Sequence, residues 1–136
     1  MTTIRAGMMA VVILIAACTQ DEKPAAAGQT PVDSRVSRET RIRELEQQAR
    51  ALAKTEGCDE AGHCGTAAVG AKGCGGPRAY LVYCKATTDE AALLRTLDEL
   101  KRVEEEYNRA EGIASDCMMI TPPAVRLEGN VCTAAD

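Results

Sequence analysis

Apolar residues recur at helical spacing in the first third of the chain. Ile42, Leu45, Ala49 and Leu52 are three, four and three positions apart. This spacing places them on one face of a helix with 3.6 residues per turn. We expect the helix to begin near Arg38 and to end at Gly57, because glycine readily takes the left-handed conformation that ends a helix.

A second helix is predicted over residues 89–111. Thr87 and Glu90 have the spacing of a capping box, and Asp89 and Glu90 lie in the first turn, where the helix dipole favours acidic side chains. Gly112 is placed to end the helix. The predicted apolar face consists of Leu93, Leu97, Leu100 and Tyr107.

The two predicted helices carry opposite net charges. Residues 35–54 hold six basic and three acidic side chains, whereas residues 89–111 hold four basic and eight acidic ones. Antiparallel packing of the two apolar faces, with complementary charges along their borders, is the simplest arrangement. Docking of a separate partner on each charged face is the alternative.

Short strands are predicted outside the helices. Residues 79–84 read Ala-Tyr-Leu-Val-Tyr-Cys, a run typical of a strand, and they follow the turn-forming sequence Gly75-Gly76-Pro77. Near the C-terminus, Glu128-Gly129-Asn130 separates two short apolar runs, which indicates a hairpin. The expected fold is a small α+β domain in which two antiparallel helices pack on a short β element.

The composition offers little material for a hydrophobic core. From residue 18 onward, Leu, Ile and Val number 18 of 119 residues, about 15%, and the chain has neither Phe nor Trp. Chains below about 20% in these residue types rarely fold by apolar burial alone. Small exported domains with thin cores are commonly stabilised by disulfides.

Six cysteines are available for such disulfides. They are Cys58, Cys64, Cys74, Cys84, Cys117 and Cys132. Six cysteines allow 15 different pairings, among which a sequence cannot choose. We favour a local bond between Cys117 and Cys132, with Cys74 or Cys84 joining the strand to its neighbours.

The N-terminal segment has the three parts of an export signal. Arg5 precedes the apolar residues 6–17, and small residues come directly before Cys18. The apolar run of 12 residues is shorter than the roughly 20 that a transmembrane helix needs. Ile15-Ala16-Ala17-Cys18 resembles the lipobox of bacterial lipoproteins, in which the cysteine becomes the acylated N-terminus.

This resemblance implies a signal peptide over residues 1–17 and a lipid anchor on Cys18. Thr19 after the cysteine implies release to the outer membrane, with the protein facing the periplasm of a Gram-negative envelope. We assign residues 18–37 to the lipidated cysteine and a flexible tether, and residues 38–136 to the disulfide-stapled domain. The alternative is an ordinary secretory peptide that leaves Cys18 as a free thiol.

Other chemistries find weaker support in the sequence. A net charge of −4 and three tyrosines as the only aromatic residues argue against nucleic-acid binding. His63 lies beside Cys64, but the cysteine spacings do not match those of zinc sites, and we expect no metal or cofactor. Residues 65–72 depart from the phosphate-binding motif and are expected to form a loop. Hydrolysis by Asp59, Glu60 or Asp116 is a third-ranked possibility, because paired carboxylates leave no spacing signature.

One part of the domain carries a further resemblance. Residues 70–83, which include Gly73-Cys74-Gly75-Gly76-Pro77, precede the acidic helix and Ser115-Asp116-Cys117. This combination resembles a group of small uncharacterised bacterial lipoproteins over about the last 80 residues. The resemblance implies a single stapled domain and supplies no catalytic residue.

The predicted function is that of a non-enzymatic binding module. Its candidate surface is the cysteine-rich loop, with Lys72, Arg78, Tyr80 and Tyr83 as contact residues. The expected ligand is an envelope protein or a cell-wall component, for example a hydrolase that the module inhibits. The alternative is a passive structural or assembly lipoprotein of the outer membrane, with the charged helix faces as docking surfaces.

Overall fold

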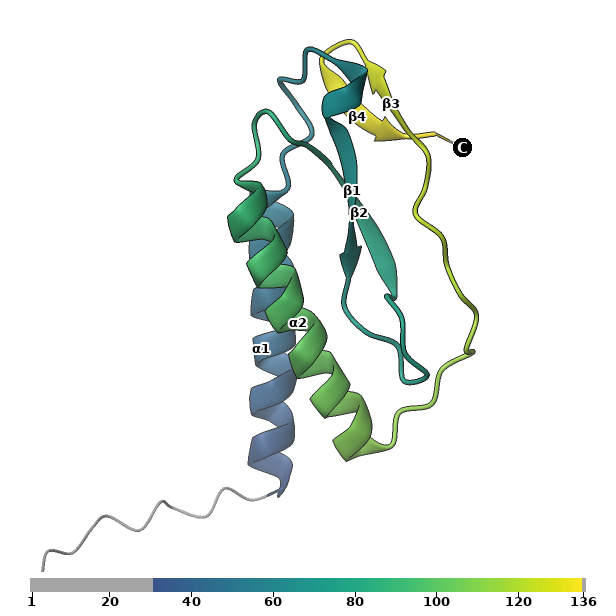
Figure 1. The fold of residues 1–136 in the computed structure, drawn as a ribbon. Coiled ribbons are helices and arrows are strands. Elements are labelled where there is room, and N and C mark those ends of the chain that lie inside the picture. Colours follow the sequence, from purple (N-terminus) through teal and green to yellow (C-terminus); the bar gives the residue numbers. More distant parts are fainter. Residues whose placement is uncertain (1–30, 136) are drawn as a thin grey trace, which may run out of the picture.

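The computed structural model describes residues 31–135, which form two helices and two hairpins (Figure 1). The predicted signal peptide, Cys18 and the first part of the predicted tether lie outside the described residues. In chain order the elements are α1 (Pro31–Leu52), a short 3-10 turn (Ala61–His63), β1 (Cys64–Val69), β2 (Ala79–Cys84), α2 (Glu90–Glu111), β3 (Val125–Glu128) and β4 (Val131–Ala134).

The helices lie side by side and run in opposite directions, with the β1–β2 hairpin packed beside them (Figure 1). The β3–β4 hairpin lies at the end of the molecule where α2 begins. Residues 113–124, which form no helix or strand, return along the side of the β1–β2 hairpin away from the helices. The predicted α+β class, with two antiparallel helices on short β elements, is therefore confirmed.

The first helix is longer at its start than the sequence suggested. It begins at Pro31, so residues 31–37, predicted to belong to the tether, are helical. Proline is well suited to the first turn of a helix because its missing N–H would have no partner there. Arg35 and Arg38 also reach Glu111 at the far end of α2, at 3.7 Å in each case. These ion pairs between helices could not be read from the local pattern.

The same helix ends at Leu52 rather than at Gly57. The reason is tertiary: the Lys54 N–H donates to the Thr88 hydroxyl at 3.1 Å, and the Lys54 carbonyl accepts from the Cys84 N–H at 2.7 Å. These bonds draw the chain away from the helix axis soon after its last turn.

The start of α2 corrects the predicted capping box. Asp89 is the N-cap, and its carboxylate accepts a hydrogen bond from the Ala92 N–H at 2.9 Å. The Thr87 hydroxyl instead donates to the Glu56 carbonyl at 2.9 Å. At the other end, Gly112 takes the left-handed conformation (φ 62°) and ends the helix as predicted.

The segment predicted to be a loop at residues 65–72 contains a strand. β1 pairs with β2 in antiparallel register, with Gly65 opposite Tyr83 and Val69 opposite Ala79. Glycine and alanine are poor strand formers, so the local sequence gave no strand signal. Glycine suits position 65, because a Cβ there would lie 3.3 Å from the Tyr83 ring. The other strand predictions, residues 79–84 and the hairpin around Gly129, are confirmed.

The buried residues form two clusters. The larger lies between the helices and the β1–β2 hairpin and contains Leu45, Ala49, Ala67, Val69, Tyr83, Leu93, Leu97, Leu100 and Val103. The smaller consists of four half-cystines, with Val82, Val125 and Leu127 packed against them. In this smaller cluster, disulfides fill the space that aliphatic side chains fill in other protein cores.

All six cysteines of the domain are paired, as predicted, but the favoured local pair is wrong. The bonds are Cys58–Cys84, Cys64–Cys132 and Cys74–Cys117. Cys132 lies in β4 and faces the start of β1, which brings it to Cys64 rather than to Cys117. Cys84, at the end of β2, does tie the strand to a neighbouring segment.

Candidate functional site

The four residues of the predicted binding surface do not form one exposed patch. Tyr83 is only 4% exposed and lies in the main core, where its hydroxyl donates to Glu90. Burial, followed by this hydrogen bond, raises the pKa of Tyr83 to about 12. Tyr80 is three residues away on the same strand and therefore lies on the opposite face of the hairpin.

Arg78 is a structural residue that joins both helices to the hairpin. Its guanidinium donates to Glu104 at 2.9 Å and to Glu46 at 2.8 Å. Glu104, whose side chain is 7% exposed, also accepts from the Ala71 N–H at 2.6 Å. Hydrogen bonds from Arg50 and then Arg78 lower the pKa of Glu46. Both carboxylate partners of Arg78 thus lie within the domain.

Lys72 is likewise occupied within the chain. Its ammonium group donates to the Asp116 carboxylate at 3.0 Å and to the Met118 carbonyl at 2.8 Å. The hydrogen bond from Lys72, assisted by one from the Met118 N–H, lowers the pKa of Asp116. Lys72 thus holds the 113–124 segment against the turn that joins β1 to β2.

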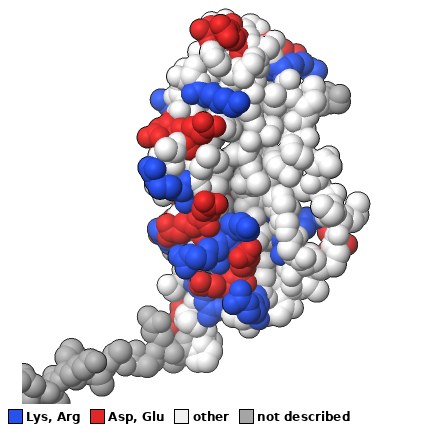
Figure 2. All heavy atoms as spheres, in the orientation of Figure 1, with Lys and Arg blue, Asp and Glu red and all other residues white. Residues whose placement is uncertain are grey.

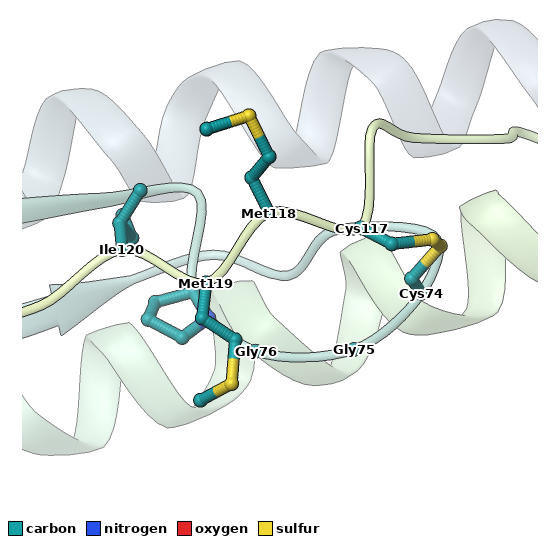
Figure 3. A pocket seen from close by; sticks show the side chains of 8 residues that line it. Cys74, Gly75, Gly76, Cys117, Met118, Met119 and Ile120 are labelled. Atoms are coloured by element: carbon teal, nitrogen blue, oxygen red, sulfur yellow. A yellow bond between two sulfur atoms is a disulfide. The ribbon is translucent and has the colours of Figure 1, made fainter.

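A different site lies where that turn meets the 113–124 segment. Residues 74–77 form one wall of a hollow of about 370 Å³, and residues 117–120 form the other. The Cys74–Cys117 disulfide joins the two walls (Figure 3). No lining residue is charged. We call this feature the disulfide hollow.

Local hydrogen bonds and a close approach fix the geometry of the disulfide hollow. The Lys72 N–H donates to the Gly76 carbonyl, and the Gly75 N–H donates to the Lys72 carbonyl, both at 2.9 Å, which closes the turn. Gly73 allows the second wall to approach, because a Cβ there would lie 2.1 Å from the carbonyl oxygen of Ile113.

The hollow is bordered by two strongly exposed methionines. Met118 is 68% exposed and Met119 is 94% exposed. Their side chains extend from opposite sides of the backbone (Figure 3). The face over the hairpin and the 113–124 segment is largely free of charged side chains, which gather instead over the helices (Figure 2). The sequence did not predict a role for these methionines because Met118-Met119-Ile120 is a short apolar run without helical or strand periodicity.

Many charged side chains on the helices form ion pairs within one helix or between the two helices. Arg41 pairs with Glu99, and the Tyr107 hydroxyl donates to Glu39 at 2.9 Å. The prediction that the two helices pack with complementary borders is thus supported by specific contacts.

The residues considered for hydrolysis or metal binding are dispersed or already bonded. His63, which is half-buried, lies 3.1 Å from Asp59 and 3.9 Å from Glu60, which are both exposed, and its hydrogen bond lowers the pKa of Asp59. Asp116 belongs to a different loop and pairs with Lys72. The described residues bring three buried sulfurs within 4.8 Å of one another, those of Cys58, Cys84 and Cys132. All three are in disulfides and so offer no thiolate to a metal.

No protein-family model, curated protein or solved structure shows a significant match to the chain. Within residues 31–135, neither helix is long and apolar enough to cross a membrane.

Glu104→Ala tests the structural role assigned to the Arg78 network. We expect the free energy of unfolding to fall by about 3 kcal/mol, because the substitution leaves the Ala71 N–H without its acceptor and Arg78 without one of its two carboxylates. Glu106→Ala, which removes an exposed partner of Arg102 from the same helix, should cost less than about 0.5 kcal/mol. Urea unfolding followed by circular dichroism measures both values. Equal losses in the two variants would contradict this role.

Tyr83 predicts a loss of stability at alkaline pH. Its pKa of about 12 in the folded chain exceeds the ordinary value of 10.0. The folded state therefore keeps this proton while the unfolded state releases it, and stability falls as the pH rises from about 10 to about 12, by up to about 1.4 kcal/mol per pH unit. Tyr83→Phe keeps the ring in the core and should flatten this slope. The comparison requires urea midpoints at several pH values between 8 and 11.5, and parallel slopes in the two proteins would count against the assignment.

Proposed function

We propose that this protein is a non-enzymatic binding module of the bacterial envelope, anchored in the outer membrane through an acylated Cys18 and facing the periplasm. Its ligand is an apolar side chain of a partner protein, bound in the disulfide hollow. The observation that carries the proposal is the presence of two largely exposed methionines beside an uncharged, covalently closed hollow. This site replaces the four-residue surface expected from the sequence.

The exposed methionines support binding for a physical reason. Covering a large exposed apolar side chain with a partner lowers the free energy, because apolar surface is removed from water. Contiguous exposed apolar surface therefore commonly marks an interaction site. Methionine is suited to this role because its unbranched, polarizable side chain adapts to the shape of the partner. Met118 and Met119 therefore offer adaptable contacts at the rim of the hollow.

The fixed backbone supports binding as well. The Cys74–Cys117 disulfide and the Lys72–Asp116 ion pair hold both walls in place before any ligand arrives. A site that is already ordered loses less conformational entropy on binding than a free loop would lose. The long irregular segment 113–124 is then best explained as a wall of a site rather than as a simple connection.

The chemistry of the lining favours a protein over a cell-wall glycan. A glycan is covered with hydroxyl groups that need hydrogen-bond partners when they leave water. The side chains that line the hollow are those of cysteine, proline, methionine and isoleucine, which are poor partners for hydroxyls. An apolar side chain requires no such partner. The proposal of a hydrolase inhibitor falls within this partner class.

A capture experiment with matched variants tests the site. Oxidised residues 19–136 are immobilised, envelope extract and peptidoglycan are passed over them, and retained material is identified by mass spectrometry. We expect one protein at near-stoichiometric level, and we expect Met118→Ser with Met119→Ser to reduce its retention at least tenfold. Val32→Ser with Val36→Ser is the control, because these two valines are also exposed, at 69% and 53%, but lie on α1.

The outcomes separate the two function classes. Retention that is lost equally in both double variants would place the binding surface elsewhere. If the chain retains neither protein nor peptidoglycan, the passive structural or assembly role becomes the better explanation.

The anchor is tested separately in cells. Metabolic labelling with an alkyne-bearing palmitate analogue should label the protein, and the label should follow the outer-membrane fraction. Cys18→Ser should abolish labelling and shift the protein to the soluble periplasmic fraction. The other six cysteines all lie in the described residues and are paired in disulfides, so none of them offers a thiol for acylation. Label that persists in Cys18→Ser would contradict lipidation at this residue.

A further inference from the structure

We propose that the Cys74–Cys117 disulfide is a thiol–disulfide exchange site, and that its reduction by a dithiol opens the disulfide hollow and abolishes binding there. The last step rests on the proposed function. The exchange itself and the opening do not depend on the proposed function, because they concern only this disulfide and the segment that it holds.

The three disulfides differ sharply in exposure. Cys58 and Cys84 are both fully buried (0%), and Cys64 and Cys132 are 6% and 2% exposed. Cys74 and Cys117 are both exposed. An attacking thiolate must reach a sulfur atom before it can exchange with it, so access alone favours this third bond.

Space for a reductant lies next to the same bond. A Cβ built on Gly75 or on Gly76 would meet no atom within 4 Å. Open space therefore lies beside the chain at these two positions, directly after Cys74 (Figure 3). The apolar lining of the hollow and the exposed Met118 provide a surface on which a dithiol protein can rest during exchange.

Few other interactions hold the second wall in place. Besides the disulfide, Asp116 and the Met118 carbonyl are bound by Lys72, and the Cys74 N–H donates to the Ser115 hydroxyl at 3.3 Å. Residues 113–124 form no helix or strand, and most of them are exposed. A segment with few buried contacts opens locally at much lower cost than the core.

The backbone of Cys117 also favours release. Its φ of 52° is the only positive value among non-glycine residues in the described chain. The left-handed conformation is unfavourable for a residue with a Cβ and persists when the surroundings impose it. Breaking the bond to Cys74 removes one of these constraints, so Cys117 can return to an ordinary conformation.

The rest of the domain keeps its own connections after this reduction. α2 ends at Glu111, before the released segment, and β3 begins at Val125, after it. The Cys64–Cys132 bond still ties β4 to β1. The opening is thus confined to one wall of the hollow and leaves the two buried clusters intact.

The exchange balances with a dithiol as the only co-reactant. One thiolate of the dithiol attacks the sulfur of Cys74 or Cys117, forms a mixed disulfide and releases the other cysteine as a thiolate, which takes up a proton. The second thiolate of the dithiol then displaces the remaining cysteine. Two electrons pass from the dithiol to the protein, which gains two thiols, and the dithiol becomes a disulfide.

The first test measures which bond is reduced. Oxidised residues 19–136 are treated with a limited amount of dithiothreitol at pH 8, quenched with iodoacetamide at intervals and mapped by mass spectrometry. We expect Cys74 and Cys117 to be alkylated at least ten times faster than the other four cysteines. Simultaneous loss of all three disulfides, or earlier reduction of a buried one, would overturn the proposal.

The second test measures the opening without any partner. Hydrogen exchange should rise over residues 113–124 in the selectively reduced chain and remain unchanged in α1, α2 and β1. The variant Cys74→Ser with Cys117→Ser, which keeps both buried disulfides, should show the same pattern with an unchanged far-ultraviolet circular dichroism spectrum. Exchange that stays at the oxidised level in both samples would show that the segment is held without this bond, and the switch would be rejected.

The third test joins the two proposals and keeps their failures distinct. A captured partner should bind the selectively reduced chain and the double serine variant at least tenfold more weakly than the oxidised chain. Equal binding would overturn control of the site by this disulfide. If no partner is captured at all, the proposed function fails, whereas the first two tests still decide whether the bond is an exchange site that opens the hollow.

Discussion

The arrangement of this small domain depends on the hydrogen bonds to the buried carboxylate of Glu104. It accepts from Arg78 and from the Ala71 N–H, and Arg78 in turn reaches Glu46 on α1. One chain of charge-assisted bonds therefore joins both helices to the end of the β1–β2 hairpin. Gly70 permits this approach, since a Cβ there would lie 2.0 Å from the Glu104 carboxylate. Bonds of this kind are stronger than neutral hydrogen bonds and fix orientation as well as distance. Because the core is thin, they set the position of the turn that carries one wall of the hollow.

Local signals in the sequence predicted most of the elements but not their connections. The helical stripes, the strand at residues 79–84 and the hairpin at Gly129 depend on neighbours within a few positions, and they are confirmed. β1 was missed because its glycine and alanines have low strand propensity, and because the close approach of Gly65 to the Tyr83 ring is a contact with another strand. The Cys64–Cys132 pair spans 68 positions and depends on how two hairpins pack. No local pattern carries that information.

The candidate site shows the same division more clearly. The chemistry of Lys72, Arg78 and Tyr83 predicts contact residues on the cysteine-rich loop. A domain with little aliphatic material instead uses such side chains to hold itself together, and all three have partners within the chain. The strongly exposed side chains at the hollow are instead apolar, those of Met118 and Met119. In a thin-cored domain, exposed apolar residues are therefore better markers of a site than charged ones.

The distribution of the disulfides links this economy to function. The two buried bonds lie within the second core cluster, where they replace side-chain packing and are shielded from solvent. The third lies outside both clusters and joins a hairpin turn to a segment with no regular structure. Stability of the whole domain therefore does not require that this segment be permanently closed, and the energetic cost of opening it is local. A binding site under redox control requires a rigid part that maintains the fold and a second part that one accessible disulfide holds closed. Here the second part is the 113–124 segment. In this chain the two parts differ because four cysteines lie in a buried cluster, whereas Cys74 and Cys117 lie outside both clusters.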